Sequence, residues 1–460
     1  MAEQEAKGLP WWQLSLFGAG CTIGTAFFLG SGIAVRTSGW LALPVFAAVA
    51  LATYFVYEAL ARMTAEHPDK GSFRTYAGQA YGRWAAFGTG WIYWFSELLI
   101  LGGTLTALGL FSQAWLPSVP LGAFAGGYAV LALLVVVLGS KGINAAENLF
   151  AVVKIAAVIG FIGVCAWWLL RGLASPSEAP NGWREAASPG WGGVWRGLLY
   201  GFYAFSGIEV MGFMAAGLRK PEQAPKAGAF MLSLIAVLYI GSIALAMLLV
   251  PAASMKPDAS PLILALDGLR LTALRHALNG VLIVSGFSIL VASLYGVSTM
   301  LVTLAQGGDA PAWTGRTWGK RKLPAAALLV NAAGMGVSVV LALLLPRSLF
   351  EHLATAGGLV LLYVWTIIVL SYLKLGRPGA WGRIKSWTAI VLMAAAASGA
   401  LSEPAGRPGF YASLGIAAAV AAATFVMHRR WTAAAERQRL RDDARSRRRF
   451  PGGRAGGGAR

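Results

Sequence analysis

Four ionisable side chains lie inside long apolar stretches of the sequence: Glu58, Glu97, Lys154 and Glu209. Charged groups are costly in the hydrocarbon of a membrane, so they usually face a cavity or a partner. Lys154 is the best candidate for chemistry, because a desolvated ammonium can release a proton and take it up again. The alternative is a permanently charged Lys154 paired with a carboxylate or with carbonyl groups. We expect structural roles for Glu58 and Glu97.

Two glycine-rich segments, residues 18–32 and 201–212, stand out among the apolar runs. Glycine costs about 1 kcal/mol in a helix interior relative to alanine, so each segment indicates either close helix packing or an interrupted helix. Interrupted helices at matching positions of two repeats are typical of a transporter binding site. Their opened ends expose N–H groups for a carboxylate and carbonyl groups for a cation. Glu209 lies in the second segment, where it would bind a ligand or simply cap freed N–H groups.

The composition is that of a membrane protein. Of the 460 residues, 57% are hydrophobic and only 12% are charged, against about 25% charged residues in an ordinary soluble domain. Runs of roughly 20 apolar residues span a bilayer, and they must be helices because hydrocarbon tolerates no unpaired backbone. We therefore predict an all-α integral membrane protein with about 12 transmembrane helices. The expected spans are residues 11–35, 41–61, 84–113, 121–139, 149–170, 194–217, 228–250, 277–304, 323–346, 350–373, 387–401 and 410–428.

The basic residues predict the orientation, since they collect on the cytoplasmic side of membrane proteins. Most of the 38 Lys and Arg residues fall on the side that would hold both termini. We expect both termini to be cytoplasmic, and the loops around Trp183 and Asp258 to lie outside. The basic segment 429–460 would lie against anionic lipid. It has no accompanying nucleic-acid-reading domain, so we expect no nucleic-acid partner.

An enzyme is the main competing class, but the sequence offers it little chemistry. The four histidines lie near span ends or in loops, and no His, Asp and Glu set has metal-ligand spacing. There is no nucleophile elbow, and Cys21 and Cys165 support no disulfide framework. We expect no catalytic residue, metal or cofactor. A channel and a non-transporting sensor remain as alternatives.

Motifs in order along residues 11–375 resemble those of the amino acid–polyamine–organocation superfamily, and within it the bacterial amino acid transporter (amino acid permease) family. The motifs are Ile23-Gly24-Thr25, Phe28-Leu29-Gly30-Ser31-Gly32, His67-Pro68, Gly71-Ser72-Phe73, Gly90-Trp91, Lys154-Ile155, Phe205-Ser206-Gly207-Ile208-Glu209, Gly308-Asp309-Ala310-Pro311 and Val364-Trp365. The resemblance implies a five-plus-five inverted repeat (LeuT-like) with two additional helices. It also implies secondary transport of amino acids, often coupled to protons.

This fold predicts four parts of the chain. They are a cytoplasmic N-terminal tail (1–10), a transport core (11–375), two further helices (376–428) and a basic, disordered cytoplasmic tail (429–460). The protein would be multi-pass in the cytoplasmic (plasma) membrane.

The two glycine-rich segments would then hold the substrate. N–H groups around Thr22 to Thr25 suit a carboxylate, carbonyl groups near Ala19-Gly20 and Phe205-Ser206 suit an ammonium, and Phe205 would cover the site. The expected substrate-binding residues are Ala19, Gly20, Cys21, Thr22, Ile23, Gly24, Thr25, Phe205, Ser206, Gly207, Ile208 and Glu209. For proton coupling, Lys154 matches the lysine of the family's fifth span, and its ammonium would bridge first-span carbonyls to Ser285 and Ser288.

The sequence departs from the family pattern at Cys21, Ala26, Leu218 and Thr299. The first two bear on the size or polarity of the pocket, and the last two on cytoplasmic gating. We predict a proton symporter of neutral L-amino acids, with small or aliphatic ones ahead of aromatic ones. The alternatives are an exchanger of amino acids or amines, or a non-transporting sensor.

Overall fold

The computed structural model describes residues 8–69, 71–138, 143–173, 190–319, 323–345, 348–402 and 404–449. Over these residues the regular secondary structure is helical, apart from two isolated bridges that join Leu9 to Leu218 and Trp318 to Leu323. The all-α prediction is therefore confirmed for this part of the chain. Trp183 lies outside the described residues.

Eleven helical stretches among the described residues are long and apolar enough to cross a membrane. The first of them, Thr25–Glu66, contains 42 residues, about twice the length that one crossing needs. It joins two helices through the 3-10 turn η1 (Gly39–Leu41). The count of twelve spans and the internal repeat stay predictions.

The first half of the chain contains α2 (Trp11–Thr22), α3 (Thr25–Ser38), α4 (Ala42–Glu66), α5 (Ser72–Tyr81), α6 (Arg83–Gln113), α7 (Leu121–Leu138), α8 (Ile143–Leu170), α10 (Gly190–Ala204) and α11 (Ile208–Ala215). The second half contains α12 (Ala224–Leu249), α13 (Pro261–Gly268), α14 (Thr272–Gln306), α15 (Ala325–Leu344), α16 (Leu349–Leu375), α17 (Ala380–Ser402) and α18 (Arg407–Arg449). Short 3-10 helices are η3 (Pro221–Gln223), η4 (Ala252–Ser254) and η5 (Ala312–Gly315).

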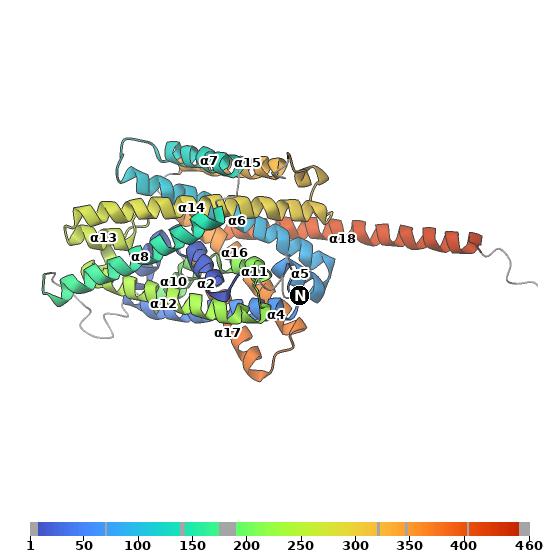
Figure 1. Cartoon of the computed structure of the whole chain (residues 1–460), viewed down its shortest axis with the longest axis horizontal. Coiled ribbons are helices and arrows are strands. Elements are labelled where there is room, and N and C mark those ends of the chain that lie inside the picture. The colour runs from blue at the N-terminus through green and yellow to red at the C-terminus, as the bar shows by residue number, and fades with distance from the viewer. Residues whose placement is uncertain are drawn as a thin grey trace, which may run out of the picture.

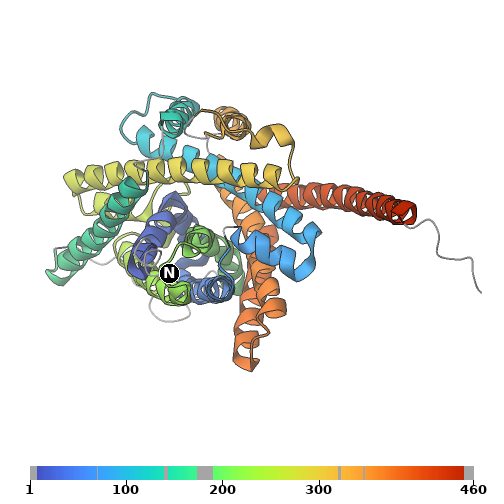
Figure 2. The same ribbon diagram turned by 45° about the vertical axis from the view of Figure 1, so that its right-hand side comes forward.

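The helices are arranged around α14, which crosses most of the molecule (Figure 1). The broken elements α2, α10 and α11 lie on one side of it, and α7 and α15 pack together on the other (Figure 2). Large buried side chains, including Phe27, Phe202, Tyr239 and Trp365, form a continuous core around the broken elements. A rigid core therefore holds the two chain breaks in place.

The last helix differs from expectation. We predicted disorder from residue 429, but α18 continues as a helix to Arg449 and projects from the body (Figure 1). The segment is rich in arginine and alanine, which are strong helix formers. Local helix propensity therefore explains why the helix does not end with its apolar part.

Candidate substrate site

The first span is interrupted where its glycines predicted. α2 ends at Thr22, where the Ile23 N–H donates to the Ala19 carbonyl at 2.8 Å, and α3 begins at Thr25. Gly24 lies between them with an extended backbone. A Cβ there would lie 2.2 Å from Ile289 Cδ1, so glycine allows α14 to approach the break.

The second interruption separates α10, which ends at Ala204, from α11, which begins at Ile208. Gly207 has φ of 105°, a left-handed conformation that only glycine adopts at little cost. A Cβ at Gly207 would lie 2.9 Å from the Cys21 carbonyl oxygen. The two predicted breaks are thus confirmed, and their backbones touch.

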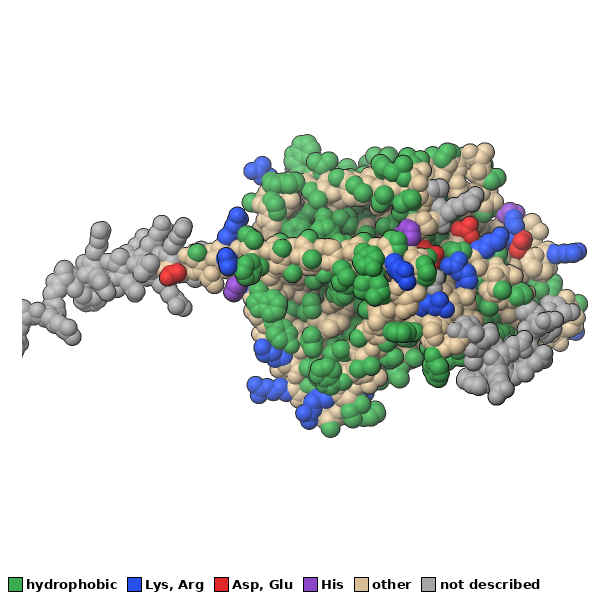
Figure 3. Space-filling model, turned by 180° about the vertical axis from the view of Figure 1, so that it is seen from behind, with side chains coloured by type: hydrophobic (Ala, Val, Ile, Leu, Met, Phe, Trp, Pro, Cys, Tyr) green, Lys and Arg blue, Asp and Glu red, His purple; other side chains and the backbone are tan. Residues whose placement is uncertain are grey.

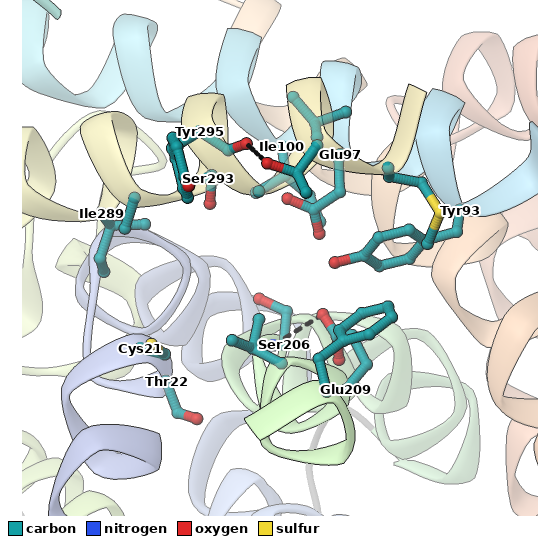
Figure 4. Close-up of a pocket in the computed structure, with 18 of the residues that line it drawn as sticks. Cys21, Thr22, Tyr93, Glu97, Ile100, Ser206, Glu209, Ile289, Ser293 and Tyr295 are labelled. Carbon is teal, nitrogen blue, oxygen red and sulfur yellow. Dashed lines mark hydrogen bonds between the residues drawn. The ribbon is translucent and has the colours of Figure 1, made fainter. Parts of the chain in front are cut away.

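A cavity of about 360 Å³ lies at this junction (Figure 4). Seven of the twelve predicted binding residues line it, namely Cys21, Thr22, Gly24, Thr25, Ser206, Gly207 and Glu209. The other walls come from α6, α11 and α14, and include Ile100, Phe213 and Met300. The cavity extends to Gly71 and Arg74, in the part of the chain between α4 and α6. We predict that this connection is cytoplasmic, and in that orientation the cavity would extend toward the cytoplasmic side.

Five predicted residues lie elsewhere: Ala19, Gly20, Ile23, Phe205 and Ile208 are not among the lining residues. Phe205 is fully buried, and its ring lies 5.2 Å from that of Tyr239 and 6.4 Å from that of Phe46. It packs in the core instead of covering the site. The interruption turns the chain, so helical periodicity does not predict the direction of this side chain.

The carbonyl groups of Ala19 and Gly20, expected to hold an ammonium, belong to residues that do not line the cavity, and each already accepts one hydrogen bond. Ala19 accepts the Ile23 N–H, and Gly20 accepts a hydrogen bond from Lys154 Nζ at 2.8 Å. Their role in binding an ammonium stays a prediction, whereas Ser206 lines the cavity directly.

Glu209 caps the helix in which it lies. One carboxylate oxygen accepts the Gly207 N–H at 3.1 Å, and the other accepts Trp365 Nε1–H at 3.3 Å. Acidic side chains are favoured in the first turn of a helix. The N-terminus of α11 thus carries its own anion, whereas α3 has no acidic residue in its first turn.

Glu97 is a cavity residue that sequence reasoning missed. Its carboxylate faces Glu209 across the cavity (Figure 4) and interacts with the hydroxyl groups of Tyr93 and Ser293. Its position as an ionisable residue within a span was the available signal. The face of α6 that meets the cavity emerges only when the helices pack, so the sequence predicted a structural role.

Glu58 has the structural contacts expected of it. Its carboxylate accepts hydrogen bonds from Arg62 Nη2 at 2.7 Å and from Lys385 Nζ at 2.8 Å. These contacts tie α4 to α17 and leave Glu58 away from the cavity.

The predicted coupling residues meet at the first break. Lys154 is fully buried and donates to Gly20 of α2, while Ser285 Oγ of α14 donates to the Ile23 carbonyl at 3.4 Å. Ser288 is also buried, one turn further along α14. Side chains from α8 and α14 therefore hold the carbonyl groups of the broken span, and none of these three side chains lines the cavity.

Three of the four departures from the family pattern, Cys21, Ala26 and Thr299, line the cavity. Leu218 instead pairs with Leu9, ahead of α2, through a β-bridge and an Arg219 N–H to Leu9 carbonyl bond of 3.0 Å. The departures thus concentrate among the side chains that line the cavity.

An all-helical membrane protein with two interrupted helices around a cavity has the architecture of a secondary transporter. The solved structure of a manganese transporter mutant from Eremococcus coleocola has this fold, with a TM-score of 0.58 and 13% sequence identity. The likeness covers 91% of this chain and 95% of that one.

The sequence matches the Amino acid permease family over residues 13–398. The chain therefore belongs to this family of transporters, within the superfamily that its motifs resemble.

Two relatives illustrate the family. A Bacillus subtilis protein named uncharacterized transporter YcgH is 46% identical, over 93% of this chain and 96% of its own length. The aromatic amino acid transport protein AroP of Salmonella typhimurium is 32% identical, over 82% of this chain and 83% of its own.

Proposed function

We propose that this chain is a secondary active transporter that carries neutral amino acids across the cytoplasmic membrane together with protons, with both termini in the cytoplasm. One observation supports this most directly. α3 begins at the cavity without an acidic side chain of its own, whereas α11 is capped by Glu209. A helix N-terminus attracts anions through its N–H groups and its dipole. The cavity thus offers one anion site, which suits the α-carboxylate of an amino acid.

The substrate ammonium would lie on the opposite side of the junction. Ser206 lines the cavity where α10 has ended, and the Glu209 carboxylate lies beside it (Figure 4). Carbonyl oxygens at the end of a helix carry partial negative charge, and a carboxylate oxygen accepts more than one hydrogen bond. This end of the cavity therefore suits a cation.

The side chain of the substrate would then point toward α6 and α14. Ile100, Phe213 and Met300 give this part apolar walls, and Glu97 supplies one hydrogen-bond acceptor. The similarity to AroP and the size of the cavity favour aromatic side chains, the reverse of the order expected from the sequence. A tyrosine hydroxyl or a tryptophan N–H would have Glu97 as its acceptor.

Proton coupling would use Lys154. Its ammonium donates to the Gly20 carbonyl beside the break, so loss of a proton from this group would change how firmly α8 holds α2. A ligand or proton shifts a conformational equilibrium only if it interacts differently with the two states. The contact between Lys154 and α2 provides such a difference.

The proposal is tested by uptake into proteoliposomes. A carrier saturates and shows counterflow of labelled substrate, a channel shows no counterflow, and a sensor moves nothing. Tyrosine, phenylalanine and leucine should compete with labelled substrate, whereas their decarboxylated amines should compete poorly because they lack the group held by α3. Equal competition by the amines would contradict the site. Accumulation that follows a sodium gradient, with no response to a pH gradient, would contradict proton coupling.

A further inference from the structure

A second hollow lies on the outer surface of the helix bundle, where α18 packs against α6 and α16. It has a volume of about 650 Å³. We call it the α18 groove. Fourteen residues line it: Tyr81, Trp84, Ala85, Gly88, Thr89, Ile92, Ile367, Leu370, Ala417, Val420, Ala421, Thr424, Phe425 and His428. Nearly all of them are apolar or aromatic, and the groove is separate from the substrate cavity.

Cationic side chains gather at one end of the α18 groove. The Lys374 ammonium lies 4.5 Å from the centre of the Tyr81 ring, and the Arg429 guanidinium lies 4.4 Å from that of Phe425. Tyr81 and Phe425 both line the groove. Figure 3 shows Lys and Arg side chains around the base of the projecting helix α18. The charges thus lie directly beside aromatic groups of the kind that mark a membrane interface.

A buried hydroxyl group lies further along the same groove, away from the end that holds the two cations. Thr89 is fully buried and lines the groove, and its Oγ1 has no hydrogen-bond partner among the described residues. Thr89 lies five residues beyond Trp84 on α6, or about 7.5 Å along the helix axis. A buried hydroxyl without a partner is unfavourable, so this one would gain from an acceptor supplied by a ligand.

We propose that the α18 groove binds one anionic phospholipid. The phosphate lies near Lys374 and Arg429, an ester carbonyl accepts the hydrogen bond of Thr89, and an acyl chain runs along the groove toward Ile92 and Ala417. Basic pockets between transmembrane helices bind anionic head groups in this way. A helix from a second protein would fill the apolar part, but it would match the two cations only if it carried an acidic residue at their level.

The test is a lipid titration of the purified, delipidated protein, followed by thermal unfolding and by native mass spectrometry. A ligand that binds the folded state raises its apparent stability. Phosphatidylglycerol should stabilise the protein and remain bound, whereas phosphatidylcholine with the same acyl chains should do so much more weakly. Glycerol phosphate alone should have little effect, because it lacks the chain that fills the groove.

Paired charge variants locate the head group. Lys374→Ala with Arg429→Ala should weaken phosphatidylglycerol binding by about fivefold for each charge removed. The matched control is Lys220→Ala with Arg383→Ala, which removes two exposed charges that we expect on the same side of the membrane. Equal weakening in both pairs would mean that net charge, and no built site, attracts the lipid.

A glycine pair locates the acyl chain. A Cβ at Gly88 would lie 3.6 Å from Thr424 Oγ1, an ordinary contact, so Gly88→Leu fills the groove without a backbone clash. Gly127→Leu makes the same change on α7, where nothing lies within 4 Å. Only Gly88→Leu should reduce lipid retention. The proposal is overturned if both lipids bind alike, if Gly88→Leu binds normally, or if it changes the oligomeric state while lipid binding persists.

Discussion

The contact between the two broken helices is most directly tested at Gly207. Alanine there adds a single methyl group, but Gly207 has φ of 105° and its Cβ would lie 2.9 Å from the Cys21 carbonyl oxygen and 3.4 Å from the Thr22 nitrogen. Both neighbours are backbone atoms. They cannot rotate away, so either α11 or α2 must shift.

Two costs add up in this variant. A left-handed conformation costs an L-residue about 1–2 kcal/mol. Forcing an extra methyl group into a packed contact typically costs about 1–3 kcal/mol. The expected destabilisation is therefore roughly 2–5 kcal/mol, a large part of the stability of a typical protein. The displaced break should also lower substrate affinity, because the binding groups come from both helices.

The measurement pairs thermal unfolding in detergent with counterflow uptake. Gly207→Ala should unfold at a lower temperature and lose at least tenfold in uptake. The matched control is Gly296→Ala, since Gly296 lines the same cavity on helix α14 but has nothing within 4 Å of its added Cβ. In a helix interior alanine is more stable than glycine by about 0.5–1 kcal/mol, so this variant should keep or raise the unfolding temperature.

A third variant separates strain from clash. Asparagine tolerates positive φ better than alanine, but it carries the same Cβ. If Gly207→Asn loses as much stability and uptake as Gly207→Ala, the clash with Cys21 causes most of the loss. If Gly207→Asn regains stability and uptake, backbone strain causes most of it. Wild-type stability and uptake in Gly207→Ala would refute the argument, because the two breaks would then not need their close approach.

The remaining predictions concern coupling, access, specificity and orientation. Lys154→Ala should abolish accumulation driven by a pH gradient while counterflow persists, and unchanged pH-driven accumulation would exclude this coupling role. Cys21, which lines the cavity, should react with an impermeant thiol reagent from the cytoplasmic side and be protected by substrate; lack of protection would argue against the site. Glu97→Leu should weaken competition by tyrosine several-fold, since a hydrogen bond is worth about 0.5–1.5 kcal/mol, with little change for phenylalanine; equal losses for both would contradict the proposed side-chain contact. Cysteine at Asp258 should label from outside whole cells and cysteine at Trp318 should not, and the reverse would invert the orientation.

The chain breaks could be predicted from the sequence because their cause is local. Glycine is unfavourable in a helix interior, so glycines near Gly24 and Gly207 indicated an interruption before any tertiary contact was known. The sequence did not predict which face of α6 lines the cavity. Glu97 appeared as one charged residue in a long apolar helix with little amphipathic pattern, so nothing in its neighbours distinguished a cavity-lining position from one that faces another helix.

Phe205 illustrates a second limit. Helical periodicity predicts which residues share a face, but the residues between α10 and α11 do not follow that periodicity, since Gly207 turns the chain through a left-handed conformation. Phe205 therefore turned into the core beside Tyr239, whereas Ser206, its neighbour, faces the cavity. The sequence motif predicted both residues as binding residues, but the backbone conformation directs only Ser206 to the cavity.

Two separate predictions from the sequence assigned different partners to the same carbonyl groups of the first span. One assigned the carbonyl of Gly20 to the substrate ammonium, and the other assigned first-span carbonyls to Lys154. In the structure Lys154 holds the Gly20 carbonyl, and neither residue lines the cavity. A substrate cation is therefore better placed beside Ser206, and in the proposed mechanism substrate and proton would act on the same break without competing for one oxygen. Such an arrangement would couple them through the position of α2, as the proposed symport requires of two ligands that never touch.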